Sequence, residues 1–186
     1  MLAGSARRDS CNKRLAAAAA AKAQALGAEV ELVDLADFPI PLYDGDLEAE
    51  QGVPANVRLV RDKLLAADGF LFACPEYNGS ITPLLKNVID WTSRPEEGVA
   101  EGLIAYRGKV AALVAASPGA LGGMRGLVHV RAILSGIGVH VVPGDLAIGG
   151  AYGAFAENGE LKEERLDSRL EATVQTLVKT ASALNS

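Results

Sequence analysis

Side chains that could bind an anion gather in residues 4–12, directly after a short apolar run. They can donate hydrogen bonds or supply positive charge: Ser5, Arg7, Arg8, Ser10 and Asn12. The segment leads into an Ala-rich stretch of helical composition, and a helix start adds unpaired backbone N–H groups and partial positive charge. Together these features favour a site for a phosphate monoester. Capping of the helix by Asp9 or Ser10 is an equally good interpretation.

A second group follows the apolar run that ends at Pro75. Tyr77 and Asn78 lie where a loop at the end of a strand would present side chains and amides to a ligand, and Gly79 allows close backbone approach. An isoalloxazine ring needs backbone amides at its pyrimidine edge and an apolar or aromatic face, and this loop can provide both. An ordinary turn is the alternative. We interpret the apolar residues that follow as core residues, or for Trp91 as a core or interface residue: Leu84, Leu85, Ile89 and Trp91.

A third segment, residues 117–126, is poor in side chains. Its sequence is SPGALGGMRG, in which five of the ten residues are Gly or Pro. Such a backbone could lie flat along the edge of a ring. A helix entry with glycine at the cap gives the same pattern, so this segment is weak evidence by itself.

Helical and strand patterns alternate along the chain. Helices are predicted at 9–26, 54–67, 82–92, 123–137 and 163–184, from their caps, prolines and apolar periodicity. Strands are predicted at 1–4, 29–34, 69–74, 109–116 and 139–142, two of them wholly apolar, as in strands buried on both faces. Residues 35–53 and 93–107 are predicted to be long loops.

This alternation predicts βαβ units and a parallel sheet. We expect an α/β fold of the flavodoxin-like type, a three-layer α/β/α sandwich with a five-stranded parallel sheet of order 2-1-3-4-5, formed by residues 1–186 as a single domain. Ligands of such sheets bind at the carboxyl ends of the strands, where the three segments above converge. Three residues precede Gly4, fewer than strands usually have, so the first strand is either shortened at its start or stunted.

Composition excludes several functional classes. Apolar residues make up 49% of the 186 residues, which is enough for a large core. The net charge of -5 argues against a nucleic-acid partner, and no apolar run is long enough for a membrane span. With two cysteines, Cys11 and Cys74, and an N-terminus that lacks a secretory apolar region, we expect a reducing, cytoplasmic location.

These motifs resemble the NADPH-dependent FMN reductase family, which also includes chromate, quinone and azo-dye reductases. The resemblance runs from Leu2 to about the end of the chain. The family's Gly-Ser-x-Arg and Ser-x-Asn pattern is matched by Gly4, Ser5, Arg7, Ser10 and Asn12. Its Pro-Glu-Tyr-Asn and Lys-Asn-x-x-Asp-Trp patterns are matched by residues 75–78 and by Lys86, Asn87, Asp90 and Trp91. Its Ser-x-Gly and Gly-Gly patterns are matched by Ser117, Gly119, Gly122 and Gly123.

The resemblance implies a site for FMN. By it, the FMN phosphate would be bound by Ser5, Arg7, Ser10 and Asn12. The isoalloxazine would be lined by Pro75, Glu76, Tyr77, Asn78 and Gly79, and its other side closed by Ser117 and Gly119. Family members are commonly homodimers or homotetramers with the flavins near the subunit interface, so we expect a homo-oligomer.

The resemblance also implies the reaction, a hydride transfer from NAD(P)H to bound FMN and then to a quinone, chromate, azo compound or free flavin. The cofactor supplies that chemistry, so we expect no catalytic residue, and the two histidines have no spacing typical of a metal site. Arg94 and Arg125 could meet a nicotinamide 2′-phosphate, but surface ion pairs explain them equally well. The alternatives are a flavodoxin-type electron carrier without nicotinamide turnover, and a flavin-free interaction domain.

Overall fold

A parallel sheet of buried apolar strands forms the centre of the structure, a computed structural model that describes residues 1–95 and 101–185. The longest strands, β2 (Gly69–Ala73) and β5 (Val110–Ala116), pair in parallel from Gly69 opposite Val110 to Ala73 opposite Val114. β1 (Leu2–Ala3) pairs with β2 on one side, while β6 (His140–Val141) and β7 (Leu146–Ile148) both pair with β5 on the other.

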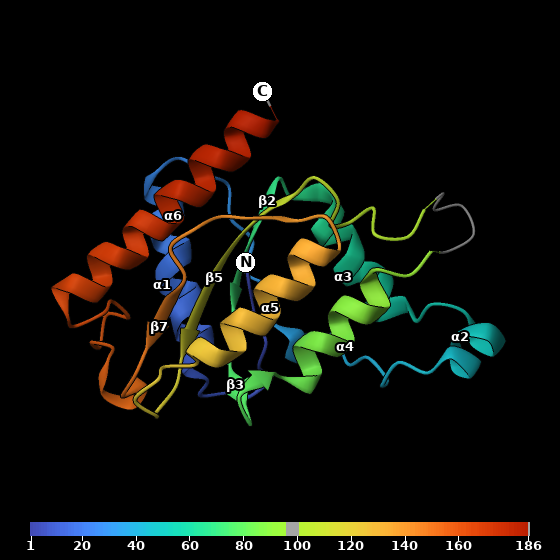
Figure 1. The fold of residues 1–186 in the computed structure, drawn as a ribbon, viewed down its shortest axis with the longest axis horizontal. Helices are drawn as coiled ribbons and strands as arrows, with labels where there is room; N and C mark the ends of the chain where they lie inside the picture. The colour runs from blue at the N-terminus through green and yellow to red at the C-terminus, as the bar shows by residue number, and fades with distance from the viewer. Residues whose placement is uncertain (96–100, 186) are drawn as a thin grey trace.

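Helices cover both faces of this sheet (Figure 1). On one face lie α1 (Cys11–Ala25) and α6 (Glu164–Leu184), whose small and aliphatic residues form one buried cluster with β5 and β7. On the other lie α3 (Ala55–Ala66), α4 (Pro83–Thr92) and α5 (Met124–Gly136), which bury the opposite side of β2 and β5. The predicted three-layer flavodoxin-like sandwich is therefore confirmed.

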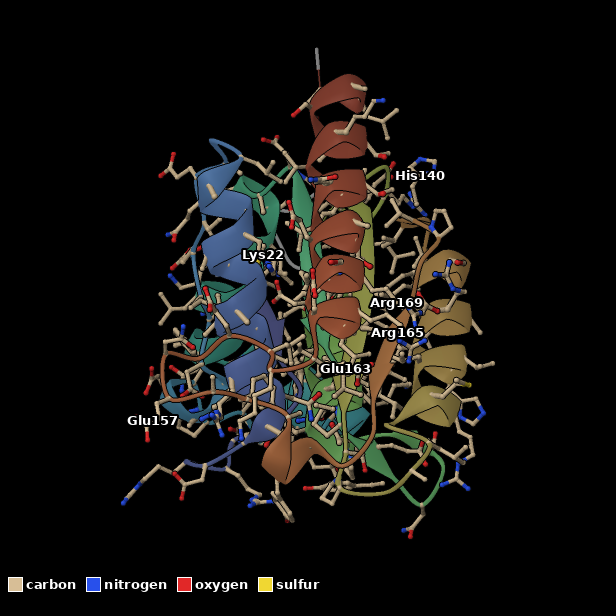
Figure 2. The ribbon with its side chains drawn as sticks, turned by 90° about the vertical axis from the view of Figure 1, so that its left-hand side faces the viewer. Lys22, His140, Glu157, Glu163, Arg165 and Arg169 are labelled. Carbon is tan, nitrogen blue, oxygen red and sulfur yellow. The ribbon has the colours of Figure 1, made fainter. Side chains whose placement is uncertain are left out.

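The first face is also held together by an ion pair. Lys22 of α1 and Asp167 of α6 approach to 2.7 Å, and Figure 2 shows Lys22 lying between the two helices. The Ala-rich sequence of α1 lets the helices pack closely here, since Ala16, Ala19 and Ala23 are all buried. The Ala-rich stretch predicted to be helical therefore also has a packing role.

The predicted strand order 2-1-3-4-5 is confirmed, but one of its strands is reduced to a single bridge. Residues 29–34 were expected to form a strand, and only Val33 pairs with the sheet, opposite Leu2. This segment is at the edge, next to a β1 of two residues, so few backbone groups lie opposite it. The prediction of a six-residue strand there was wrong.

Several short elements were missed. The predicted loop 35–53 contains the short 3-10 helix η1 (Leu35–Asp37) and helix α2 (Gly45–Gln51), each capped by an aspartate side chain, Asp34 and Asp44. Residues 75–81 contain an antiparallel hairpin, β3 (Glu76–Tyr77) and β4 (Ser80–Ile81). A second 3-10 helix, η2 (Ala151–Gly153), follows β7 in a stretch predicted only as Gly-rich. Part of the predicted loop 93–107 falls outside the described residues.

A candidate cofactor site where three loops meet

The loop between β1 and α1 is fixed to its neighbours at Gly4. The Gly4 N–H donates to Ala73 O at 2.9 Å, continuing the β1–β2 ladder. The Thr82 hydroxyl, at the start of α4, donates to Gly4 O at 2.8 Å and accepts from Leu85 N, so it caps α4 and anchors the loop at once. Thr82 begins the helix predicted at 82–92, and its bond to Gly4 could not be seen in the sequence because the two residues are 78 positions apart.

Ser5, Ser10 and Arg7 lie at the open N-terminal end of α1. Ser10 is the N-cap, its Oγ accepting from Lys13 N, and the Ser5 Oγ accepts from Arg7 N. Both serines are buried and Arg7 is exposed. Because both hydroxyl oxygens accept from the backbone, their own hydrogens can be donated to an anion, and α1 adds its partial positive charge.

Asn12 is buried at the same end of α1 but faces the sheet. Its Nδ2 donates to Ala116 O at 2.8 Å, and its Oδ1 accepts from Ala116 N at 3.0 Å. The side chain therefore joins the first loop to the end of β5, directly before Ser117. Predicted as a phosphate ligand, Asn12 is placed by the structure as a link between two of the three loops.

The second loop is the hairpin β3–β4, whose turn is formed by Asn78 and Gly79. Both residues have positive φ, 52° and 80°, the pairing of a type I′ turn. Asn-Gly between two extended segments is a known hairpin signal, so this element could have been predicted from the sequence. The turn leaves Tyr77 52% exposed beside the carboxyl end of β2.

Glu76 points away from that open side, towards the start of α5. Arg125 Nε donates to its Oε1 at 2.8 Å, a second Arg125 nitrogen donates to the same oxygen, and Gly126 N donates to Oε2 at 3.1 Å. Burial raises the pKa of Glu76, but these hydrogen bonds and the guanidinium charge outweigh it, so the pKa lies below its ordinary value. The carboxylate is thus ionised and fully engaged within the protein.

The third loop runs from Ser117 to the N-cap of α5, Gly123. Ser117 is held at both backbone groups, its N–H donating to Ile148 O at 3.0 Å and its carbonyl accepting from Ala151 N at 3.1 Å. Gly119 is exposed, and its N–H donates to the Ser117 Oγ. The contact of Ala151 in η2 with this loop was not predicted, although the preceding Gly149-Gly150 pair was a signal of a tight backbone approach.

The two arginines considered for a 2′-phosphate are both in ion pairs. Arg94 Nε donates to Glu48 at 2.9 Å, and Arg125 is bound to Glu76 as described. The histidines are exposed, and His129 Nδ1 lies 2.8 Å from the Ser80 hydroxyl. The surface ion pairs are therefore the interpretation that the geometry favours for both arginines.

The Lys-Asn-x-x-Asp-Trp motif of α4 has a positioning role. Asn87 Nδ2 and Trp91 Nε1 both donate to Pro41 O, at 2.9 and 2.8 Å, while Asn87 Oδ1 accepts from Tyr43 N at 2.8 Å. Trp91 is fully buried, as predicted for a core residue. The motif thus fastens the segment around Pro41 to α4 and does not itself line the site.

Other chemistry is sparse in the described part of the chain. Cys74 is buried at the end of β2, where burial raises the pKa of its thiol, and Cys11 is half-buried; neither forms a disulfide. Among residues 1–95 and 101–185, no group of three His, Cys, Asp or Glu side chains could hold a metal ion. Within the same residues, no helix combines the length and apolar character that crossing a membrane requires.

Comparison with known sequences gives consistent results. The profile of the family described as NADPH-dependent FMN reductase matches residues 1–153. The chain is 38% identical over 152 residues to the NAD(P)H-dependent FMN reductase PA1204 of Pseudomonas aeruginosa, an alignment that covers 81% of this chain and 77% of the relative. It is 38% identical over 181 residues to the NAD(P)H:quinone oxidoreductase of Solanum tuberosum, covering 95% and 88%.

Comparison with solved structures agrees. FerB of Paracoccus denitrificans, a flavoenzyme NAD(P)H:(acceptor) oxidoreductase, superposes with a TM-score of 0.82 at 28% identity, covering 98% of this chain and 95% of FerB. A flavodoxin of Streptococcus pneumoniae superposes with a TM-score of 0.60 at 14% identity, covering 96% and 95%, which shows a shared fold alone.

Proposed function

The chain belongs to the NADPH-dependent FMN reductase family, and we propose that it passes a hydride from NAD(P)H to bound FMN and then to a quinone, chromate, azo compound or free flavin. The observation that carries the proposal is the meeting of three loops at the carboxyl end of the sheet, cross-linked by Thr82 and Asn12. Small molecules are the acceptors of such reductases, and the exposed flavin face that the loops would leave selects weakly among them.

The residues of the first loop fit a phosphate monoester. The buried Ser5 and Ser10 hydroxyls can donate to it, Arg7 supplies charge, and α1 contributes free N–H groups. Asn12 would support this loop through Ala116, with one amide hydrogen left for the phosphate. This donor set carries no carboxylate that would repel an anion, apart from the exposed Asp9.

The second and third loops fit a flat ring. Tyr77, Asn78 and Gly79 would offer backbone amides and an aromatic face on one side, after Pro75, which follows the end of β2. Ser117 and Gly119 would close the other side with a side-chain-poor backbone. FMN, when bound, supplies the redox chemistry, and the chain supplies position and amide dipoles that stabilise negative charge on the ring. No residue of the chain needs to act as acid or base.

Anaerobic addition of NADPH to the flavin-loaded protein tests the reaction. The flavin absorption bands should bleach rapidly and return when a quinone is added, because the hydride passes to the ring and then to the acceptor. A bound flavin that NADPH leaves oxidised would point to an electron carrier. Protein that takes up no flavin would contradict both functions.

Replacement of Arg7 by alanine should weaken FMN binding. A charge-assisted hydrogen bond contributes about 1.5–3 kcal/mol, which corresponds to roughly 10–100-fold in Kd. Arg107→Ala is the matched control, since Arg107 is also exposed but precedes β5, at the opposite end of that strand from Ser117. Fluorescence titration of the apo-protein with FMN measures both. Equal affinity of Arg7→Ala and the native protein would remove Arg7 from the phosphate site.

We also propose that residues 1–186 act as a single domain in the cytoplasm and assemble into a homodimer or homotetramer, with neither a nucleic acid nor a membrane as partner. The free thiols of Cys11 and Cys74 support the location. The assembly is supported by an apolar stripe at the start of α5, where Leu121, Met124 and Val128 are 53, 56 and 61% exposed. Sedimentation velocity measures the number of copies.

A further inference from the structure

Side-chain contacts join each pair of the three loops. Thr82 links the first loop to the start of α4, just after the hairpin, and Asn12 links the first loop to the end of β5. Glu76 links the hairpin to α5, which continues the third loop, and the Ser80 and His129 side chains also meet between these two elements. The Thr82 and Asn12 links hold buried backbone groups. The Glu76 link is ionic, and it reaches the hairpin turn that we propose to bind the ring.

Glu76 serves α5 as a cap from outside the helix. The N-cap residue, Gly123, has no side chain to accept from the free N–H groups of the first turn. The Glu76 Oε2 accepts from Gly126 N instead, and a carboxylate at this end also interacts favourably with the helix dipole. The Glu76 side chain is 7% exposed, so its carboxylate is shielded by the hairpin and α5, whereas the Arg125 side chain is 61% exposed and keeps one side in water.

The hairpin lies directly against the same turn of α5. A Cβ built on Gly126 would be 3.2 Å from Ser80 O and 3.4 Å from the Glu76 Cβ, so the helix has no room for a side chain there. At the turn of the hairpin, a Cβ on Gly79 would lie 3.7 Å from the Arg125 Cζ. The guanidinium therefore lies under the turn, fixed by the carboxylate at the base of the same hairpin.

We propose that Glu76 is a positioning residue: through Arg125 and Gly126 it sets the orientation of the Tyr77–Gly79 turn against the flavin ring, without its carboxylate touching the ring. This inference deepens the proposed function and rests on it. Arg125, as the partner of Glu76, then helps to hold the turn in place and does not bind nicotinamide. Because Arg125 is largely exposed, the ion pair alone would be worth little; the role assigned to Glu76 depends on its shielded carboxylate accepting from three donors, one of them the Gly126 N–H.

Glu76→Gln tests the proposal because the side chain keeps its size and loses its charge. We expect FMN affinity to fall by about tenfold or more and the visible circular dichroism of bound flavin to change, because the ring sits against a displaced turn. Amide exchange at Gly126 in the flavin-free protein should speed up. Arg125→Lys keeps a cation for the carboxylate and should lie between the native protein and Glu76→Gln in all three measurements.

The control is Glu160→Gln, which removes an exposed carboxylate near η2 and should leave all three measurements unchanged. If the native protein binds FMN and Glu76→Gln binds it with the same affinity and the same visible dichroism, Glu76 does not position the turn. If the native protein binds no FMN, the proposed function fails first, and the two failures are distinguished by the native titration alone.

Discussion

Replacement of Gly122 by alanine is expected to lower the free energy of unfolding by about 3 kcal/mol or more, one of the largest effects available to a single methyl group here. Gly122 has a φ of 65°, which L side chains rarely adopt. A Cβ at this position would lie 2.6 Å from Ile148 N, 2.7 Å from Ile148 C and 2.8 Å from Ala147 C. These are backbone atoms of β7, so they cannot rotate away as a side chain would.

Relief of that clash requires β7 or the third loop to move. Because Ser117 and Ile148 are hydrogen-bonded, either movement would also displace the Ser117–Gly119 backbone proposed to close the flavin site. Urea unfolding of the flavin-free protein measures the stability, and FMN titration measures the site. Both should suffer.

Gly136→Ala is the matched control for this substitution. Gly136 ends α5, has no positive φ, and a Cβ there would meet no atom within 4 Å. The same chemical change should therefore be neutral, or stabilise the helix by up to about 1 kcal/mol. Similar unfolding midpoints for the two variants would show that the β7 contact does not constrain the loop.

Gly122 also shows where prediction from the sequence stopped. The glycine content of residues 117–126 predicted a flat backbone beside a ring, and the loop does lie at the expected edge of the sheet. The contact that requires glycine, however, is with β7, a strand of three residues between Gly144 and Gly149. Its three residues, Leu-Ala-Ile, are too few to give a strand signal of their own, and they form a strand only because β5 extends far enough to pair with them.

The central part of the fold was predictable for the opposite reason. β2 and β5 are continuous apolar runs that need burial on both faces, so the sequence alone determines their place in the sheet. Residues 29–34 alternate in the same way as an edge strand, yet they lie beside a two-residue β1 and form one bridge at Val33. Pairing at an edge depends on how many backbone groups the neighbouring strand places opposite it, and local strand propensity does not predict this number.

Replacement of Asn12 by alanine is expected to destabilise the flavin-free protein by about 2–4 kcal/mol, because Ala116 N and Ala116 O would both lose a buried partner. Asn12→Asp should cost more, since it removes the donor and places a carboxylate against the Ala116 carbonyl. Urea unfolding without FMN measures both variants. Asn158→Ala is the control, because Asn158 is an exposed loop residue that bonds only to nearby Glu160 in the described structure.

The same measurement distinguishes two roles for Asn12, binding of the FMN phosphate and support of the loop through Ala116, which the family motif by itself does not distinguish. Ligand binding stabilises the native state by RT ln(1 + [L]/Kd), about 2.7 kcal/mol at 100 times Kd. If Asn12 acted mainly on the phosphate, Asn12→Ala would keep native stability without FMN and lose part of this increment. If it acts through Ala116, as the geometry indicates, stability falls without FMN and the increment falls too, because the first loop is no longer held against β5. A residue shared by a whole family's cofactor motif can therefore serve the cofactor chiefly by building the place where it binds.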